Sequence, residues 1–232
     1  MGEIGERLEE VRARIAESAR RVGRDPQAVR LIAVSKTKPV PLLQEAILAG
    51  ATAFGENYVQ ELVGKREAIG GGVEWHFIGH LQTNKVRSIV PFCSLIHGVD
   101  SLRLAREIDL RAGQVGRRQA VLIEVNVAGE GTKFGVCPAD VPGLAREIGE
   151  LPHVALRGLM AMPPFSPDPE DSRPHFIALR TLQEKLLAGG TPPEQCGELS
   201  MGMTADYGIA IEEGATLVRV GTAIFGSRDA VT

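Results

Sequence analysis

Short apolar runs alternate with amphipathic segments along most of this chain. Residues 3–22 carry apolar side chains at spacings of three or four, which predicts an amphipathic helix that ends near Gly23. Strand-like apolar runs follow at residues 31–34, 51–54, 75–79, 95–99, 121–127, 156–162, 198–202 and 217–220. Helical patterns lie between them at residues 40–49, from 59 to the glycines at 70–72, from 102 onward, and at 139–149, 171–188 and 205–213. Residues 128–135 and 163–169 are predicted loops.

Strict alternation of strand and helix predicts parallel strands joined by crossover helices. Eight such strands in this length favour an α/β fold with a single (β/α)8 TIM barrel and one extra N-terminal helix. An open, doubly wound sheet is less favoured, because no G-x-G-x-x-G motif follows the first strand. Composition does not change along the chain, so residues 1–232 are predicted to form a single domain.

Composition narrows the classes of function. The chain has 232 residues, 44% of them hydrophobic, and a net charge of −3, which gives no broad basic surface for nucleic acid. Its three cysteines form no C-x-x-C pair, which argues against a disulfide framework or a zinc site, and no metal ligands are predicted. Neither a signal peptide nor a run of about 18 apolar residues is present. The sequence therefore predicts a cytoplasmic protein with no membrane partner.

The first predicted strand ends at Ser35 and Lys36, where a parallel barrel collects its chemistry. Lysine is scarce here, six of 26 basic residues, although a solvated surface role is the ordinary one for this side chain. A lysine partly desolvated at a barrel mouth can have its pKa lowered from about 10.4 and act as a Schiff-base nucleophile. Lys36 is the candidate for that role.

Polar side chains also follow other predicted strands. If the barrel is correct, they converge on one face: Lys36, Asn57, His80, Asn126, Ser200 and Arg219. The loops after the last two strands, Ser200 to Thr204 and Gly221-Thr222, offer amides and hydroxyls for a phosphate, although each residue also suits ordinary turn or cap chemistry. These residues alone fit two ligands, pyridoxal phosphate or a sugar phosphate handled by an aldolase.

Two of these side chains have further interpretations. Arg219 could face the nitrogen of a pyridine ring or form an ion pair with Glu124 or Glu198. His80 faces the mouth without an evident acid partner in the sequence.

Five segments in order, AVSK (33–36), FGENYVQE (54–61), WHFIGHLQTNK (75–85), LSMGMT (199–204) and VRVGTAIFG (218–226), resemble the YggS/PROSC family of pyridoxal phosphate homeostasis proteins. The resemblance covers essentially the whole chain. It implies the barrel of the alanine racemase N-terminal domain (fold type III), with Lys36 forming the internal aldimine of pyridoxal 5'-phosphate. It further implies that Arg219 faces the pyridine nitrogen, that Asn57 lines the pocket, and that the two glycine loops hold the phosphate. The implied cofactor-binding residues are Lys36, Asn57, Ser200, Met201, Gly202, Arg219, Gly221 and Thr222. Thr204 and Ala205 stand where many relatives have Ser and a polar residue, and Thr204 keeps the hydroxyl.

The resemblance implies that the protein buffers or delivers pyridoxal phosphate and affects amino-acid balance, with no established catalytic reaction. Apo forms of pyridoxal phosphate enzymes are the possible recipients of the cofactor. The alternative is a low-activity amino-acid racemase, and a more distant one is a Schiff-base aldolase without cofactor. A racemase needs two bases, and Lys36 supplies one. The sequence ends soon after the eighth strand, leaving no room for the domain that supplies the second. No helix face carries an apolar stripe that indicates an interface, so a monomer is expected.

Overall fold

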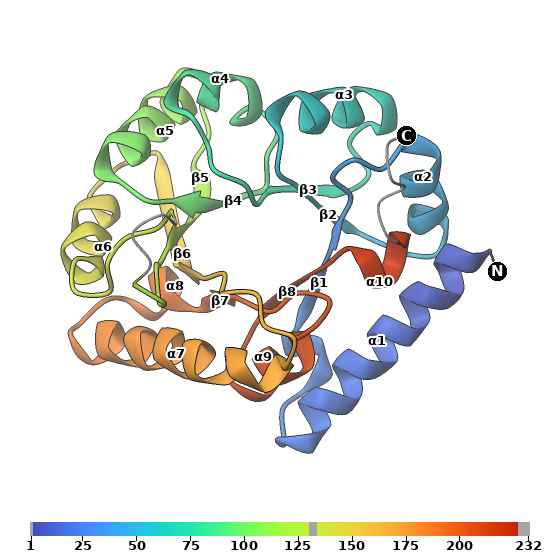
Figure 1. Ribbon diagram of the computed structural model, residues 1–232. Helices are drawn as coiled ribbons and strands as arrows, with labels where there is room; N and C mark the ends of the chain where they lie inside the picture. Colours follow the sequence, from blue (N-terminus) through green and yellow to red (C-terminus); the bar gives the residue numbers. More distant parts are fainter. Residues whose placement is uncertain (1, 130–133, 227–232) are drawn as a thin grey trace.

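The computed structural model describes residues 2–129 and 134–226, which form a closed barrel of eight parallel strands (Figure 1). The strands follow one another around the barrel in chain order, and the last pairs with the first. They are β1 Arg30–Val34, β2 Ala53–Glu56, β3 Glu74–Phe77, β4 Leu95–Val99, β5 Gln119–Glu124, β6 Val154–Met160, β7 Glu198–Ser200 and β8 Leu217–Val220. The predicted (β/α)8 barrel is confirmed.

Helices surround the strands on the outside (Figure 1). In the described residues the α-helices are α1 Glu3–Arg21, α2 Val40–Leu48, α3 Val59–Ile69, α4 Val86–Ile89, α5 Leu102–Gln114, α6 Val141–Gly149, α7 Arg173–Ala188, α8 Pro193–Cys196, α9 Tyr207–Glu212 and α10 Thr222–Phe225. Short 3-10 helices lie at η1 Pro26–Ala28, η2 Thr83–Lys85 and η3 Pro169–Ser172. Over the described ranges, no helix has the length and apolar character needed to cross a bilayer.

The strands bury side chains on both faces, as a parallel barrel requires. The inward-facing residues form one small apolar cluster: Ile32, Ala53, Leu95, Leu122, Met160 and Leu217. The outward-facing residues join the inner faces of the helices in a much larger core, in which Phe54 and Trp75 pack with ring centroids 5.7 Å apart. The apolar runs of the sequence arise from this double burial.

The predicted N-terminal helix is confirmed as α1. It buries a stripe of apolar residues, Ile4, Leu8, Val11, Ile15 and Ala19. It packs against α2, α9 and α10, and so covers the seam where β8 closes on β1. After α1, Arg24 donates hydrogen bonds to the carbonyl oxygens of Ile211 (2.6 Å) and Ala215 (2.9 Å), which ties the N-terminal segment to the end of α9.

Several element ends differ from the predictions. The strand predicted to reach residue 127 ends at Glu124, because Val125 leaves the ladder and forms an isolated bridge with Val136. The strand predicted at 51–54 runs from Ala53 to Glu56 instead, which puts a carboxylate on a buried strand. The pattern did not predict the short helices α4, α8 and α10. Of the predicted loop at 128–135, residues 130–133 lie outside the described part of the chain.

Candidate functional site

Lys36 lies in the turn that follows β1. Its side chain is half-buried, and the next residue, Thr37, has a φ of +64°, a left-handed conformation that is uncommon for a β-branched side chain. Because β1 pairs with both β2 and β8, Lys36 lies between the strand that precedes Asn57 and the strand that carries Arg219. The three predicted residues therefore belong to neighbouring strands: Lys36 and Asn57 follow the carboxyl ends of β1 and β2, and Arg219 lies within β8, opposite Ile32 of β1.

A buried ion pair lies directly beside Lys36. Glu56 has no exposed surface, and its Oε1 accepts hydrogen bonds from Lys65 Nζ (2.7 Å) and Ser35 Oγ (2.6 Å). Lys65 Nζ also donates to the carbonyl oxygen of Ser35 at 2.7 Å. Burial raises the pKa of Glu56, and the hydrogen bonds from Lys65 and Ser35 oppose that rise. The residue before Lys36 is thus held through both its side chain and its main chain.

The residue after Lys36 is held by the same cluster. Glu61 Oε2 accepts hydrogen bonds from the main-chain N–H of Thr37 (2.7 Å) and from Lys65 Nζ (2.8 Å). Burial acts to raise the pKa of Glu61, but these hydrogen bonds outweigh it and lower the pKa overall. Sequence reasoning missed this cluster. Its available signals were a carboxylate at the end of a buried strand and the i, i+4 spacing of Glu61 and Lys65.

Arg219 points into the barrel from β8 and is 3% exposed. Its Nη2 donates to the carbonyl oxygen of Ala161 at 2.9 Å, and its Nη1 donates to Ser200 Oγ. Burial lowers the pKa of Arg219 to about 10, while the negative charges of Glu124 and Asp206 act to raise it. The guanidinium therefore keeps its charge at neutral pH.

Glu124 and Glu198, the two predicted ion-pair partners of Arg219, lie at different ends of the barrel. Glu198 lies at the amino end of the barrel, where it accepts a hydrogen bond from Arg30 at 3.1 Å. Glu124 ends β5, and burial together with the charge of Asp100 raises the pKa of Glu124 to about 7. Of the two, Glu124 is the one whose charge acts on Arg219.

The loops after β7 and β8 approach each other closely. Gly202 has a φ of +91°, and a Cβ there would lie 2.5 Å from the Cβ of Ala210. A Cβ at Gly221 would lie 3.1 Å from the carbonyl oxygen of Val34, so the loop after β8 also touches the end of β1. The Gly221 N–H points to Thr204 Oγ1 at 3.4 Å. Glycine at 202 and 221 lets these main chains come together.

The remaining predicted residues take different positions at this end. Thr222 is exposed, Asn57 is half-buried, and Met201 is buried. The Oδ1 atom of Asn57 is buried and has no hydrogen-bond partner among the described residues. Ser200 is fully buried, and its hydroxyl is engaged inside the barrel with Arg219 and His97. Its predicted contact with a phosphate stays a prediction, whereas its observed contacts link the Arg219 guanidinium to the His97 imidazole.

His80 has the acid partner that the sequence did not reveal. Its Nδ1 lies 3.5 Å from Asp100 Oδ2, at the carboxyl end of β4. The imidazole also stacks on Phe134, with ring centroids 3.9 Å apart and an interplanar angle of 13°. The two partners come from separate loops, so only the fold brings them to His80.

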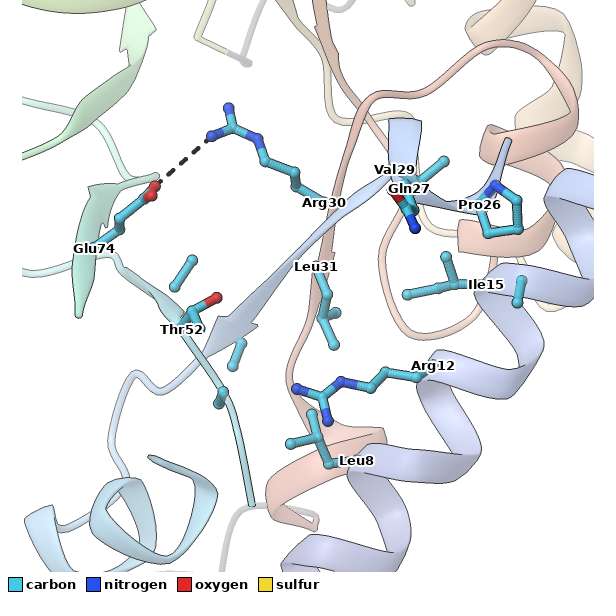
Figure 2. Close-up of a pocket in the computed structure, with 14 residues that line it drawn as sticks. Leu8, Arg12, Ile15, Pro26, Gln27, Val29, Arg30, Leu31, Thr52 and Glu74 are labelled. Carbon is cyan, nitrogen blue, oxygen red and sulfur yellow. Dashed lines mark ion pairs between the residues drawn. The ribbon is translucent and has the colours of Figure 1, made fainter. Parts of the chain in front are cut away.

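A pocket of about 320 Å³ lies away from this site, between α1 and the amino ends of β1 and β2 (Figure 2). Leu8 and Ile15 of α1 face Leu31 across it, and Arg30 lies 3.7 Å from Glu74 at its edge. None of the predicted site residues lines this pocket. The chemistry-bearing side chains collect at the opposite end of the barrel.

Comparisons with known proteins agree with this fold. The alanine racemase N-terminal domain family matches residues 7–229. A pyridoxal phosphate homeostasis protein of Aquifex aeolicus is 46% identical over 224 residues, which is 96% of this chain and 97% of the relative. One of Pseudomonas aeruginosa is 44% identical over 232 residues, 99% and 97% of the two chains. The structure of PipY of Synechococcus elongatus with pyridoxal phosphate bound has a TM-score of 0.84 at 36% identity, and covers 97% of this chain and 100% of PipY.

The closed eight-stranded barrel and the family match define a protein of the alanine racemase N-terminal domain class. Within that class, the chain belongs to the family of pyridoxal phosphate homeostasis proteins. The resemblance indicated by the five sequence segments is confirmed.

Proposed function

We propose that this protein binds pyridoxal phosphate at the carboxyl end of the barrel, holds it as a Schiff base on Lys36, and serves in the homeostasis of the cofactor by buffering and delivering it. One observation carries the proposal: the residues on both sides of Lys36 are anchored to a buried ion cluster, beside a strand that presents a buried, charged arginine. Such anchoring fixes the direction in which a nucleophilic lysine leaves the barrel wall.

The residues present suit the parts of this cofactor. Arg219 carries N–H donors for a pyridine nitrogen. The close-packed loops at Gly202 and Gly221, with the hydroxyls of Thr204 and Thr222, suit a phosphate. The unpartnered Oδ1 of Asn57 can accept a hydrogen bond from a ligand. Pyridoxal phosphate would supply an electrophilic carbonyl and a ring that can accept electrons.

Arg219 favours a holding role over amino-acid chemistry. A guanidinium that stays charged at neutral pH donates to the ring nitrogen and disfavours its protonation, which weakens the ring as an electron acceptor. The family names of the relatives support the same role. Apo forms of pyridoxal phosphate enzymes are the recipients that this proposal implies.

Absorption spectra with borohydride trapping test the proposal. The purified protein incubated with pyridoxal phosphate should turn yellow, bleach on reduction, and carry a pyridoxyl group on the Lys36 peptide. Lys36→Ala should lose the reducible absorption and retain weaker binding through the phosphate. Lys38→Ala is the matched control, because it removes a lysine from the same turn and should leave the spectrum unchanged. A pyridoxyl group on another lysine, or a wild-type protein that stays colourless, would refute the proposal.

A further inference from the structure

Four buried polar side chains, Arg219, Ser200, His97 and His76, form a continuous row across the barrel interior that ends at the exposed carboxylate of Glu74. Ser200 Oγ lies 2.8 Å from His97 Nδ1, and His97 Nε2 lies 3.0 Å from His76 Nδ1. His76 Nε2 lies 3.3 Å from Glu74 Oε2. Together with the hydrogen bond from Arg219 to Ser200, these contacts join β8, β7, β4 and β3 from the carboxyl end of the barrel to its amino end. We call this row the Arg219–Glu74 chain.

The two end groups of the Arg219–Glu74 chain, together with neutral imidazoles, fix the direction of every hydrogen bond in it. A carboxylate can only accept, so His76 donates from Nε2 to Glu74, and a neutral His76 then accepts at Nδ1 from His97 Nε2. A neutral His97 with its proton on Nε2 accepts at Nδ1 from the Ser200 hydroxyl, which in turn accepts from Arg219, because a guanidinium can only donate. Both imidazoles are thereby assigned the same neutral tautomer.

The surroundings keep both imidazoles neutral. His97 is fully buried and His76 is 1% exposed. Burial lowers the pKa of His97 well below its usual range, and the charges of Arg219 and Arg30 lower it further. Burial also lowers the pKa of His76, although Glu74 acts against this. The charged residues that face the pair or line the cavity beside His76 are Arg30 (β1), Glu74 (β3), Arg157 (β6), Glu198 (β7) and Arg219 (β8).

The Glu74 end of the Arg219–Glu74 chain is accessible from outside the barrel. His76 lines a cavity of about 290 Å³ at the amino end, together with Glu74 and Arg30. The Glu74 side chain is 53% exposed. A substitution at Glu74 therefore reaches the chain without disturbing the packed interior.

We propose that Glu74, His76 and His97 are positioning residues for Arg219: they orient the Ser200 hydroxyl so that it accepts from Arg219, and so aim the other N–H groups of the guanidinium at the ring nitrogen of the cofactor. The inference rests on the proposed function for the target of Arg219. Without an oriented Ser200, the guanidinium keeps its hydrogen bond to Ala161 but loses one of its two observed anchors.

NMR of the ligand-free protein with ¹⁵N-labelled histidine tests the direction of the chain. At pH 7.5, His76 and His97 should each be neutral, with the proton on Nε2. An Nδ1 proton on His97, or a charged imidazole at that position, would overturn the inference. This readout needs no cofactor, so it is separate from the test of the proposed function.

Glu74→Leu tests the positioning role from the far end of the barrel. It removes the final acceptor, and it should give His97 a second set of ¹⁵N signals, shift the ¹⁵N signal of the bound ring nitrogen, and weaken pyridoxal phosphate binding about two- to tenfold. Glu74→Gln keeps an acceptor oxygen and should restore wild-type behaviour. Glu198→Leu is the matched control, since it removes another carboxylate paired with Arg30 at the same end but outside the chain.

Equal effects of Glu74→Leu and Glu198→Leu on the ring nitrogen and on affinity would overturn the positioning role. If the wild-type protein takes up no pyridoxal phosphate, the proposed function and the positioning role toward the ring nitrogen both fail. The histidine spectra then still decide whether the Arg219–Glu74 chain has the stated direction.

Discussion

Glu56 is a carboxylate with no exposed surface, and Lys65 is the cation that compensates it. Taking such a pair out of water is costly, but removing one partner costs more, because the other charge is left buried alone. The pair also carries Ser35, and through Glu61 it holds Thr37. The turn that carries Lys36 therefore depends on a second lysine, Lys65, whose ammonium group is held by Ser35, Glu56 and Glu61.

Lys65→Met should lower the free energy of unfolding by about 3–5 kcal/mol at pH 7, since it leaves Glu56 uncompensated. It should also weaken pyridoxal phosphate binding, because the turn at Lys36 loses its anchor. Urea unfolding and a binding titration measure the two effects. The double variant Glu56→Gln with Lys65→Met removes both charges and should recover most of the stability. If the double variant is as unstable as the single one, the packing of Lys65 rather than its charge is what matters.

The pH dependence of Lys65→Met has a definite sign. Burial already raises the pKa of Glu56 in the folded protein, and loss of Lys65 removes an influence that lowers it. Between the unfolded pKa and the raised folded pKa, the folded state binds more protons, so stability falls as pH rises through that window. Unfolding of Lys65→Met at pH 5 should therefore require more urea than at pH 7. A variant equally unstable at both values would contradict the assignment.

The sequence was sufficient to predict that Lys36 follows the first strand, because the end of a buried strand is visible in the apolar pattern; its role as the Schiff-base lysine stays a prediction. It could not reveal Glu56 with Lys65, or His76 with His97, because each pair is made by strand register and helix packing. His76 and His97 lie within apolar runs of the sequence, and only the pairing of β3 with β4 brings their ring nitrogens to 3.0 Å from each other. His80 shows the same limit, since its partners Asp100 and Phe134 come from different loops.

At the scale of elements, the loop between β7 and α9 is shaped by one main-chain conformation. Gly202 turns the chain out of β7 with a positive φ, and its missing Cβ lets α9 pack against the loop. The strand predicted at 198–202 ends at Ser200 for this reason. Apolar periodicity detects where side chains are buried, but it does not detect where φ changes sign.

Gly202→Ala should weaken pyridoxal phosphate binding at least tenfold and lower the free energy of unfolding. Left-handed backbone costs about 1–2 kcal/mol for a residue with a Cβ, and here the added Cβ would also meet Ala210 at 2.5 Å. Gly190→Ala is the matched control, because Gly190 has a φ of +92° with nothing within 4 Å of the added Cβ. The control should lose stability from the backbone alone and bind the cofactor normally. Equal affinity in both variants would show that the loop after β7 is not part of the binding site.

At the scale of the molecule, the packing that stabilises the fold and the predicted binding site lie in different parts of the barrel. Helix α1 packs over the seam between β8 and β1, and its apolar stripe and its pocket with the amino ends of β1 and β2 contain no predicted site residue, whereas the carboxyl end carries Lys36 and the two glycine loops. Barrels commonly divide stability and chemistry in this way. The Arg219–Glu74 chain connects the two parts by directional hydrogen bonds. Substitution of an apolar residue of α1 should therefore change stability, whereas substitution of Glu74 should change pyridoxal phosphate affinity.

Leu8→Ala tests the apolar half of this argument. Leu8 is fully buried in α1, so its truncation should cost about 2–5 kcal/mol and lower the melting temperature by about 5–15 °C. Leu48→Ala makes the same change at a side chain that is 89% exposed, and it should leave the melting temperature almost unchanged. Pyridoxal phosphate affinity should stay within about twofold of wild type in both variants, because neither side chain belongs to a hydrogen-bond path to Arg219. A large loss of affinity in Leu8→Ala would mean that α1 shapes the binding site through α10, with which it packs, and that packing as well as hydrogen bonding connects the two ends of the barrel.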